Sequence, residues 1–175
     1  MHPRCFPTLC PLEPLVGSAV VHFACHGESD SINPSSSRLY LAGQDGSLDH
    51  LMVRDLAVTS LEMAQLAYLS ACSTAENASH DLLDEVIHIA SAFLLVGFPH
   101  VVGTFWEAYD GAAKNMSRIF YKELASKMEQ STALDRQEAF AYAVHDAVTA
   151  LRMGRVEGSK QKNASNNVIA WAPFK

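Results

Sequence analysis

A cysteine and a histidine, each placed directly after an apolar run, could together form a nucleophilic site. Cys72 follows the run 64–71 (AQLAYLSA). His26 follows the run 19–25 (AVVHFAC). A thiol acts as a nucleophile only as the thiolate, so it needs a base or a positive field nearby. If the two runs are neighbouring strands, the imidazole of His26 could accept the thiol proton. The spacing therefore indicates a cysteine–histidine pair at the rim of a sheet.

The same strand ends offer backbone N–H groups for an oxyanion. Gly27 has no side chain to shield its N–H, which together with the N–H of Cys72 could bind the developing negative charge. Each side chain also has an ordinary alternative: Cys72 as a buried, inert core cysteine, and His26 as a hydrogen-bonded turn residue. Two neighbours of the same types have structural interpretations. His22 lies in mid-strand, and Cys25 faces away from His26 into the core.

The elements that must position these residues follow from the apolar pattern. Short, nearly continuous apolar runs predict strands buried on both faces of a parallel sheet, at 19–25, 64–71, 100–106 and 168–174. Helical periodicity, with acidic residues at the start or Gly at the end, predicts helices at 84–96, 111–128 and 131–153. The polar stretch 28–37 is typical of a loop, and 38–42 of a small strand. This alternation predicts a mostly parallel α/β sheet with helices on both faces, and function at the carboxyl ends of its strands.

The composition favours one globular domain that binds neither nucleic acid nor membrane. The chain has 175 residues, of which 49% are hydrophobic and 18% charged, and a formal net charge of -6. Its 13 Lys and Arg residues are scattered, whereas phosphate binding needs them clustered. No apolar run approaches the roughly 18 residues of a membrane span. The four cysteines show neither a disulfide framework nor zinc-site spacing, which favours a reducing, cytoplasmic location. We expect no metal and no cofactor.

Three segments around the two candidate residues resemble the motifs of the CHAT domain family, which belongs to the caspase-like (clan CD) cysteine peptidases. They are VVHFACHG at 20–27, YLSACSTA at 68–75 and AFLLVGFPHVVGTFWEAYD at 92–110. The ordered set is far more specific than any one segment. His26 lies 46 residues before Cys72, close to the roughly 50 residues that separate the two in caspases.

This resemblance implies a caspase-hemoglobinase-like three-layer sandwich and attack of the thiol on a peptide carbonyl. His26 would act as general base and then as general acid, and Gly27 and Cys72 would supply the oxyanion-hole N–H groups. The family pattern requires no third catalytic residue. The chain would then be a cysteine endopeptidase that acts on a protein or peptide substrate.

A further segment, WEAYD at 106–110, resembles the W-D-x-x-D segment of separase, in which an acidic residue lines the pocket for a basic P1 side chain. By this resemblance Asp110 is the first candidate for the S1 pocket and Glu107 the second. A carboxylate that pairs in bidentate fashion with a guanidinium offsets its own desolvation. An equal alternative is that Asp110 caps the helix that begins at Gly111.

The expected boundaries are an irregular, proline-rich arm at 1–18 and the CHAT domain at 19–175. Relatives place additional strands before the strand that bears the histidine, so we expect these N-terminal strands to be lacking. The chain would then be a shortened version or a fragment of a longer protein, which could carry a helical-repeat (TPR-like) region.

Three functions remain open at this point. The first is the active cysteine endopeptidase, which cuts after Arg or Lys. The second is a catalytically silent or latent CHAT module for protein interaction or signalling. The third is a non-peptidase α/β enzyme whose cysteine is incidental, for example a small thiol hydrolase.

Overall fold

The apolar runs of the sequence form the strands of a parallel sheet. The computed structural model describes residues 15, 17–28, 30, 32–43, 46–56, 61, 63–70, 72–73, 85–104, 110–130, 132 and 135–154. The chain divides into two compact units, residues 1–106 and 107–175, which are taken here in turn. The strand expected at 168–174 and most of the arm expected at 1–18 lie outside the described residues.

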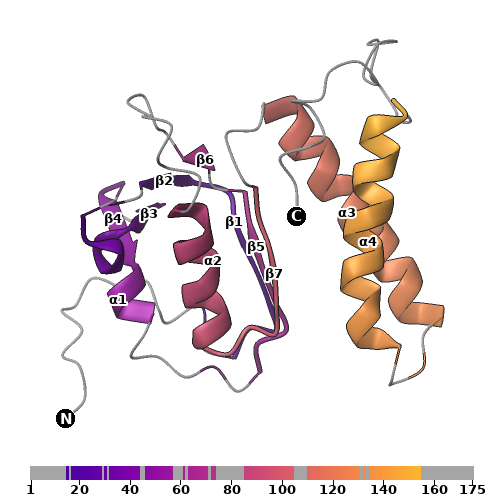
Figure 1. Cartoon of the computed structure of the whole chain (residues 1–175), viewed down its shortest axis with the longest axis horizontal. Helices are drawn as coiled ribbons and strands as arrows, with labels where there is room; N and C mark the ends of the chain where they lie inside the picture. Colours follow the sequence, from indigo (N-terminus) through magenta and orange to yellow (C-terminus); the bar gives the residue numbers. More distant parts are fainter. Residues whose placement is uncertain are drawn as a thin grey trace. The chain divides into compact units, whose positions relative to one another are not determined.

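The first unit contains a three-stranded parallel sheet in the order β1-β5-β7 (Figure 1). Its strands are β1 (Val20–Phe23), β5 (Leu66–Leu69) and β7 (His100–Val102). All three lie within runs predicted to be strands, although each strand is shorter than its run. Val20 is 48% exposed and His22 is also exposed, so the prediction that β1 is buried on both faces is wrong. Among the strands that the structure describes, β1 lies at the end of the order and pairs with β5 alone, so fewer neighbouring side chains cover it.

Helix α2 (Glu85–Leu95) covers one face of this sheet (Figure 1). Side chains alternate along a strand, so every second residue of β1 and β5 faces the helix. The Phe93 ring lies 5.1 Å from the Phe23 ring and 5.8 Å from the Phe98 ring, measured between centroids. Removing each such large side chain from water contributes about 1.5–3 kcal/mol. The buried cluster between helix and strands includes Phe23, Ala67, Leu69, Ala92, Phe93, Val96 and Phe98.

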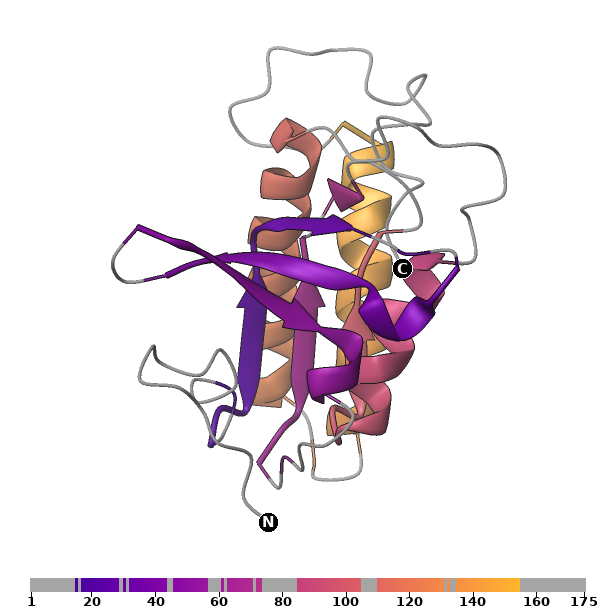
Figure 2. The same cartoon turned by 90° about the vertical axis from the view of Figure 1, so that its left-hand side faces the viewer.

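A second sheet of four strands runs across the direction of β1 and β5 (Figure 2), in the order β4-β3-β2-β6. Its strands are β2 (His26–Glu28), β3 (Arg38–Ala42), β4 (Leu48–Met52) and β6 (Cys72–Ser73). The pairs β2–β3 and β3–β4 are antiparallel, and β2–β6 is parallel. The small strand predicted at 38–42 is confirmed.

The sequence predicts a loop from Glu28 onward, whereas the chain continues as strand β2 through Glu28. The three residues of β2 include no β-branched or aromatic residue, so their composition does not signal a strand. Pairing with β3 on one side and β6 on the other supplies the strand instead. The predicted mostly parallel sheet is thus joined by a second sheet that is mainly antiparallel.

Side-chain hydrogen bonds link the described residues between β2 and β3. Asp30 Oδ1 accepts hydrogen bonds from the backbone N–H groups of Ile32 and Asn33, at 3.0 and 2.8 Å. The Asp30 N–H donates to Ser37 Oγ at 3.0 Å, and Ser37 is only 2% exposed. This Asx turn, with the one-turn 3₁₀ helix η2 (Pro34–Ser36), returns the chain to start β3 opposite β2.

The outer strand β4 has side-chain acceptors for its backbone. The N–H of His50 donates to Asp49 Oδ1 at 3.0 Å, and the N–H of Met52 donates to Asp55 Oδ2 at 3.2 Å. Asp55 lies in the single-turn helix α1 (Val53–Leu56), which follows β4 directly. Leu51 of β4 and its partner Leu39 of β3 face inward and are buried in the core.

The turn between α2 and β7 depends on a glycine. Gly97 has a φ of 116°, which side-chain-bearing residues rarely adopt. Beside it, the Leu61 N–H donates to the Val96 carbonyl at 3.2 Å. A Cβ atom built on Gly97 would lie 2.9 Å from the Leu61 carbonyl oxygen. Gly97 therefore provides both the backbone conformation and the space for this close approach.

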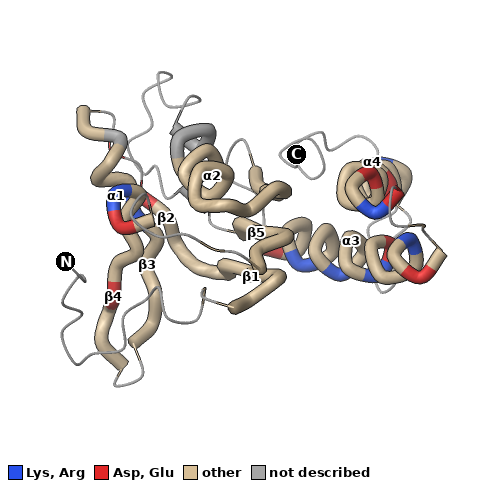
Figure 3. Tube along the Cα trace, turned by 90° about the horizontal axis from the view of Figure 1, so that it is seen from below, with Lys and Arg blue, Asp and Glu red and all other residues tan. Residues whose placement is uncertain are grey.

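The second unit is built on two helices that pack together, α3 (Asp110–Gln130) and α4 (Arg136–Arg152). Both helices were predicted, and the second begins five residues later than the expected 131. Both helices carry charges of both signs on their surfaces (Figure 3), and Lys127 Nζ pairs with Asp146 Oδ2 at 2.6 Å across the two helices. In the part of the chain that the structure describes, no helix is long and apolar enough to cross a membrane.

Candidate active site

The backbones of His26 and Cys72 lie side by side. They are the first residues of β2 and β6, and the parallel pairing of these strands sets them directly opposite each other. Adjacent strands are about 4.8 Å apart, so side chains at these two paired positions could interact directly. The expected approach of the thiol to the imidazole lies outside the described atoms, because only the backbone of Cys72 is described.

The register of this pair is inherited from the larger sheet. In β1 and β5, Val20 pairs with Leu66, an offset of 46 residues (66 − 20). His26 and Cys72 have the same offset (72 − 26), so the two segments keep the same pairing register as they pass from the first sheet into the second. Between the two sheets, the Ser70 N–H donates to the Phe23 carbonyl at 2.8 Å and keeps the chains paired. The buried parallel sheet therefore determines which residue faces His26.

A row of four residues crosses the second sheet. His50 pairs with Tyr40, Tyr40 with His26, and His26 with Cys72. Positions paired across adjacent strands lie on the same face, so His50, Tyr40 and His26 share the face opposite to Leu39 and the core. His26 is exposed on this face, whereas Gly27 is buried beneath it.

Next to this row lies an ion pair that the sequence analysis did not find. Arg38 donates from Nε to Glu28 Oε2 at 3.0 Å and from Nη2 to Glu28 Oε1 at 3.1 Å. The Tyr40 hydroxyl also donates to Glu28 Oε2, and the Arg38 guanidinium lies 5.9 Å from the centre of the Tyr40 ring. The signal that could have found this cluster is the alternation of polar residues in His26-Gly27-Glu28 and in Arg38-Leu39-Tyr40, each of which places two polar residues on one face.

The cluster shifts the titration of its members. The pKa of Glu28 is lowered, first by the hydrogen bonds from Arg38 and then by that from Tyr40. Donation to the Glu28 carboxylate raises the pKa of Tyr40, because loss of its proton would break this bond. On the other side of Tyr40, the His50 ring makes an edge contact at 5.1 Å between centroids. Tyr40 is thus held by three neighbours.

Comparison with protein families identifies the chain. The model of the CHAT domain matches residues 10–175. The chain belongs to the CHAT domain family. This confirms the resemblance seen in the motifs, and it places the chain in a family related to the caspase-like cysteine peptidases. The mixed α/β structure with its parallel sheet is compatible with that fold. No curated protein matches the chain.

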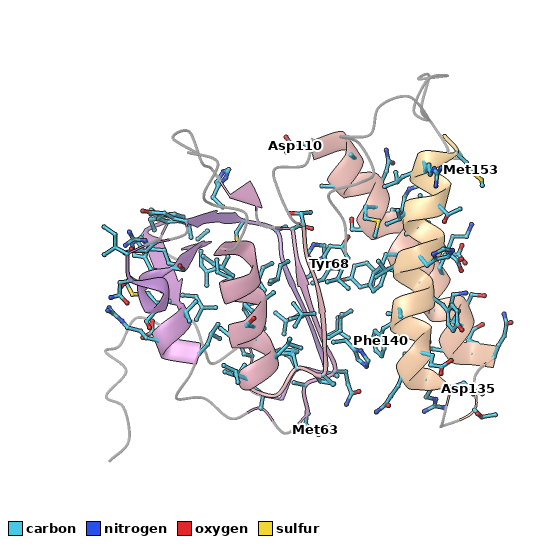
Figure 4. The ribbon with its side chains drawn as sticks, viewed as in Figure 1. Met63, Tyr68, Asp110, Asp135, Phe140 and Met153 are labelled. Carbon is cyan, nitrogen blue, oxygen red and sulfur yellow. The ribbon has the colours of Figure 1, made fainter. Side chains whose placement is uncertain are left out.

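Two residues of this CHAT domain are natural controls for the candidate pair. The thiol of Cys25 packs against the hydrophobic core, as predicted, and burial raises its pKa to about 11. His22 Nε2 forms a hydrogen bond with Ser70 Oγ at 2.9 Å, and its ring lies 4.6 Å from that of Tyr68. Tyr68 projects from the face of the sheet opposite to α2 (Figure 4). His22 therefore joins β1 to the end of β5, and partial desolvation of its ring by these neighbours lowers its pKa.

Of the two acidic candidates for the S1 pocket in this CHAT domain, the structure describes only Asp110. Asp110 is the first residue of α3 and is exposed (Figure 4). Its charge lies in the first turn of the helix, where the helix dipole favours an anion. Glu107 lies outside the described residues. Both assignments to a pocket therefore stay predictions. Among the described residues, no group of three or more His, Cys, Asp or Glu side chains could hold a metal ion.

Proposed function

We propose that this CHAT domain is a cysteine endopeptidase in which His26 and Cys72 form the catalytic dyad and a basic residue is preferred at P1. The observation that supports this most directly is the in-register pairing of the two residues on adjacent strands. Membership of a caspase-like family supports the reaction class. The proposal includes the three-layer arrangement of helices on both faces of the sheet, and a reducing cytoplasmic setting in which the thiol stays free.

The proposed reaction proceeds in two stages. His26 accepts the proton of the Cys72 thiol, and the thiolate attacks the carbonyl carbon of the scissile bond. The N–H groups of Gly27 and Cys72 bind the oxyanion, and collapse of the tetrahedral intermediate transfers the proton from His26 to the leaving amine. Water, deprotonated by His26, then attacks the thioester carbonyl carbon. The C–S bond breaks, the acyl group leaves as a carboxylic acid, and His26 returns its proton to the Cys72 thiolate. No cofactor takes part.

Preference for Arg or Lys at P1 is assigned to Asp110, with Glu107 as the second candidate. A guanidinium that forms two charge-assisted hydrogen bonds with a carboxylate gains both affinity and orientation. The protein or peptide substrate would supply this cation.

The first experiment is covalent labelling with an acyloxymethyl ketone that carries Arg at P1. We expect labelling of the wild type at Cys72 and none of Cys72→Ala. His26→Ala should be labelled at least about 100-fold more slowly than the wild type, because general-base assistance contributes at least this factor. The matched controls Cys25→Ala and His22→Gln should be labelled like the wild type. A folded wild-type protein that is not labelled would contradict the proposal and favour the latent CHAT module.

The assignment of Asp110 needs its own comparison. Asp110→Asn should slow labelling by the Arg probe about 10- to 100-fold, because one charge-assisted pair is lost. Labelling by a probe with Leu at P1 should not fall. Asp135→Asn is the matched control, because Asp135 is an exposed aspartate at the start of α4. Equal effects of Asp110→Asn on both probes would contradict the pocket assignment.

A further inference from the structure

His26 has a fixed neighbour on each side within its sheet. Strand β2 lies between β6, which carries Cys72, and β3, which carries Tyr40. In an antiparallel pair such as β2–β3, side chains directly opposite each other have Cβ atoms about 4.5–5.5 Å apart, which makes Tyr40 the direct neighbour of His26 on that side. The rotamers of an exposed histidine on this strand therefore differ in whether the ring leans toward Cys72 or toward Tyr40.

The Tyr40 side chain is locked in place. Its hydroxyl donates to Glu28, the Arg38 guanidinium lies over its ring, and the His50 ring contacts it from β4. Glu28 is in turn held by two hydrogen bonds from Arg38. All of these partners lie on the face that His26 shares.

We propose that Tyr40, locked by Glu28 and Arg38, is a positioning residue that closes the β3 side of His26 and directs its imidazole toward Cys72. The inference rests on the proposed function, because it assumes that His26 acts as the general base for Cys72. It deepens that function, since the dyad is ordered by a neighbour that does not touch the reacting atoms. A misplacement of a catalytic group by about 1 Å can cost on the order of 100-fold in rate.

The test replaces the ring and keeps the strand. Tyr40→Val supplies a β-branched residue that suits a strand but removes the ring at the position opposite His26. At saturating Arg probe, its rate of Cys72 labelling should fall about 10- to 100-fold, while the probe concentration for half-maximal rate stays the same. Tyr40→Phe keeps the ring and should stay within about threefold of the wild type. Tyr142→Val is the matched control, because Tyr142 also carries a cation over its ring, Lys127 at 5.8 Å, but lies on α4.

A second measurement does not depend on activity. The χ1 angle of His26, obtained from three-bond NMR couplings, should report one rotamer in the wild type and in Tyr40→Phe. In Tyr40→Val the couplings should average over several rotamers. If Tyr40→Val does not fold, Glu28→Gln replaces it with a smaller effect in the same direction, because the charged acceptor of the lock is lost.

The outcomes separate the inference from the proposed function. A wild type that is not labelled overturns the peptidase, and the couplings then decide the role of Tyr40 alone. A labelled wild type with Tyr40→Val within threefold of its rate overturns the inference and leaves the peptidase standing. A single His26 rotamer in Tyr40→Val also overturns it.

Discussion

The turn at Gly97 allows a quantitative prediction about stability. In Gly97→Ala, the residue must adopt a φ of 116°, which costs of order 1–3 kcal/mol for a side-chain-bearing residue. The new Cβ would also lie 2.9 Å from the Leu61 carbonyl oxygen, which is backbone and cannot rotate away. Moving Leu61 would weaken its hydrogen bond to Val96, which contributes about 1 kcal/mol.

One effect of this substitution acts in the opposite direction. Alanine restricts the unfolded chain more than glycine does, which stabilises the fold by about 0.4–1 kcal/mol. The net expectation for Gly97→Ala is a loss of about 2 kcal/mol in the free energy of unfolding, or about 4–8 °C in Tm for a chain of this length.

Gly111→Ala provides the matched control. Gly111 lies in the first turn of α3, and a Cβ built there has no heavy atom within 4 Å. Alanine is favoured over glycine in helices by up to about 1 kcal/mol, so this variant should be slightly more stable than the wild type. Urea unfolding followed by circular dichroism measures both, with equal slopes as the check that stability alone has changed. Gly97→Ala as stable as the wild type would refute the reasoning.

Three further predictions concern the core, a thiol and an ion pair. Phe93→Ala should lower the free energy of unfolding by about 3–5 kcal/mol, because Phe93 is fully buried. Leu95 on the same helix is 84% exposed, so Leu95→Ala should change this free energy by less than about 0.5 kcal/mol. Urea unfolding of the two variants measures the difference. The pKa of about 11, against 9.0 for a free thiol, predicts that iodoacetamide alkylates Cys25 about 100-fold more slowly in the folded than in the unfolded protein; peptide mapping that shows equal rates would exclude its burial. The lowered pKa of Glu28 stabilises the fold above the unfolded value of about 4.3, and this stabilisation is lost as the pH falls through the lower folded value. The Tm difference between wild type and Glu28→Gln should therefore be larger at about pH 7 than at about pH 3, and a constant difference would contradict the ion pair.

The sequence was informative where burial alone decides structure. The apolar runs that contain Leu66–Leu69 and His100–Val102 form strands because their side chains are removed from water, and the amphipathic pattern of α3 identifies that helix to within two residues at each end. Strand β2 of the second sheet escaped prediction because His26–Glu28 becomes a strand only through its neighbours. Local propensity carries no information of this kind.

The candidate site was predictable in part for the same reason. His26 and Cys72 could be proposed from their positions after apolar runs and from the family motifs. Their direct pairing depends on the register between two chain segments 46 residues apart, which no local pattern determines. The contacts of Tyr40 with Glu28 and His50 combine three strands, so they appear only in the folded structure.

The carboxylates of Asp49 and Asp55 occupy backbone hydrogen-bond donors on the β4 edge of the second sheet. They accept the N–H groups of His50 and Met52, donors that an outer strand would otherwise offer to an incoming chain. A peptide or a second copy of the chain would have to displace both carboxylates before it could extend the sheet beyond β4. The β4 edge of the described sheet thus resists templated growth, while His26 stays exposed on β2, two strands away.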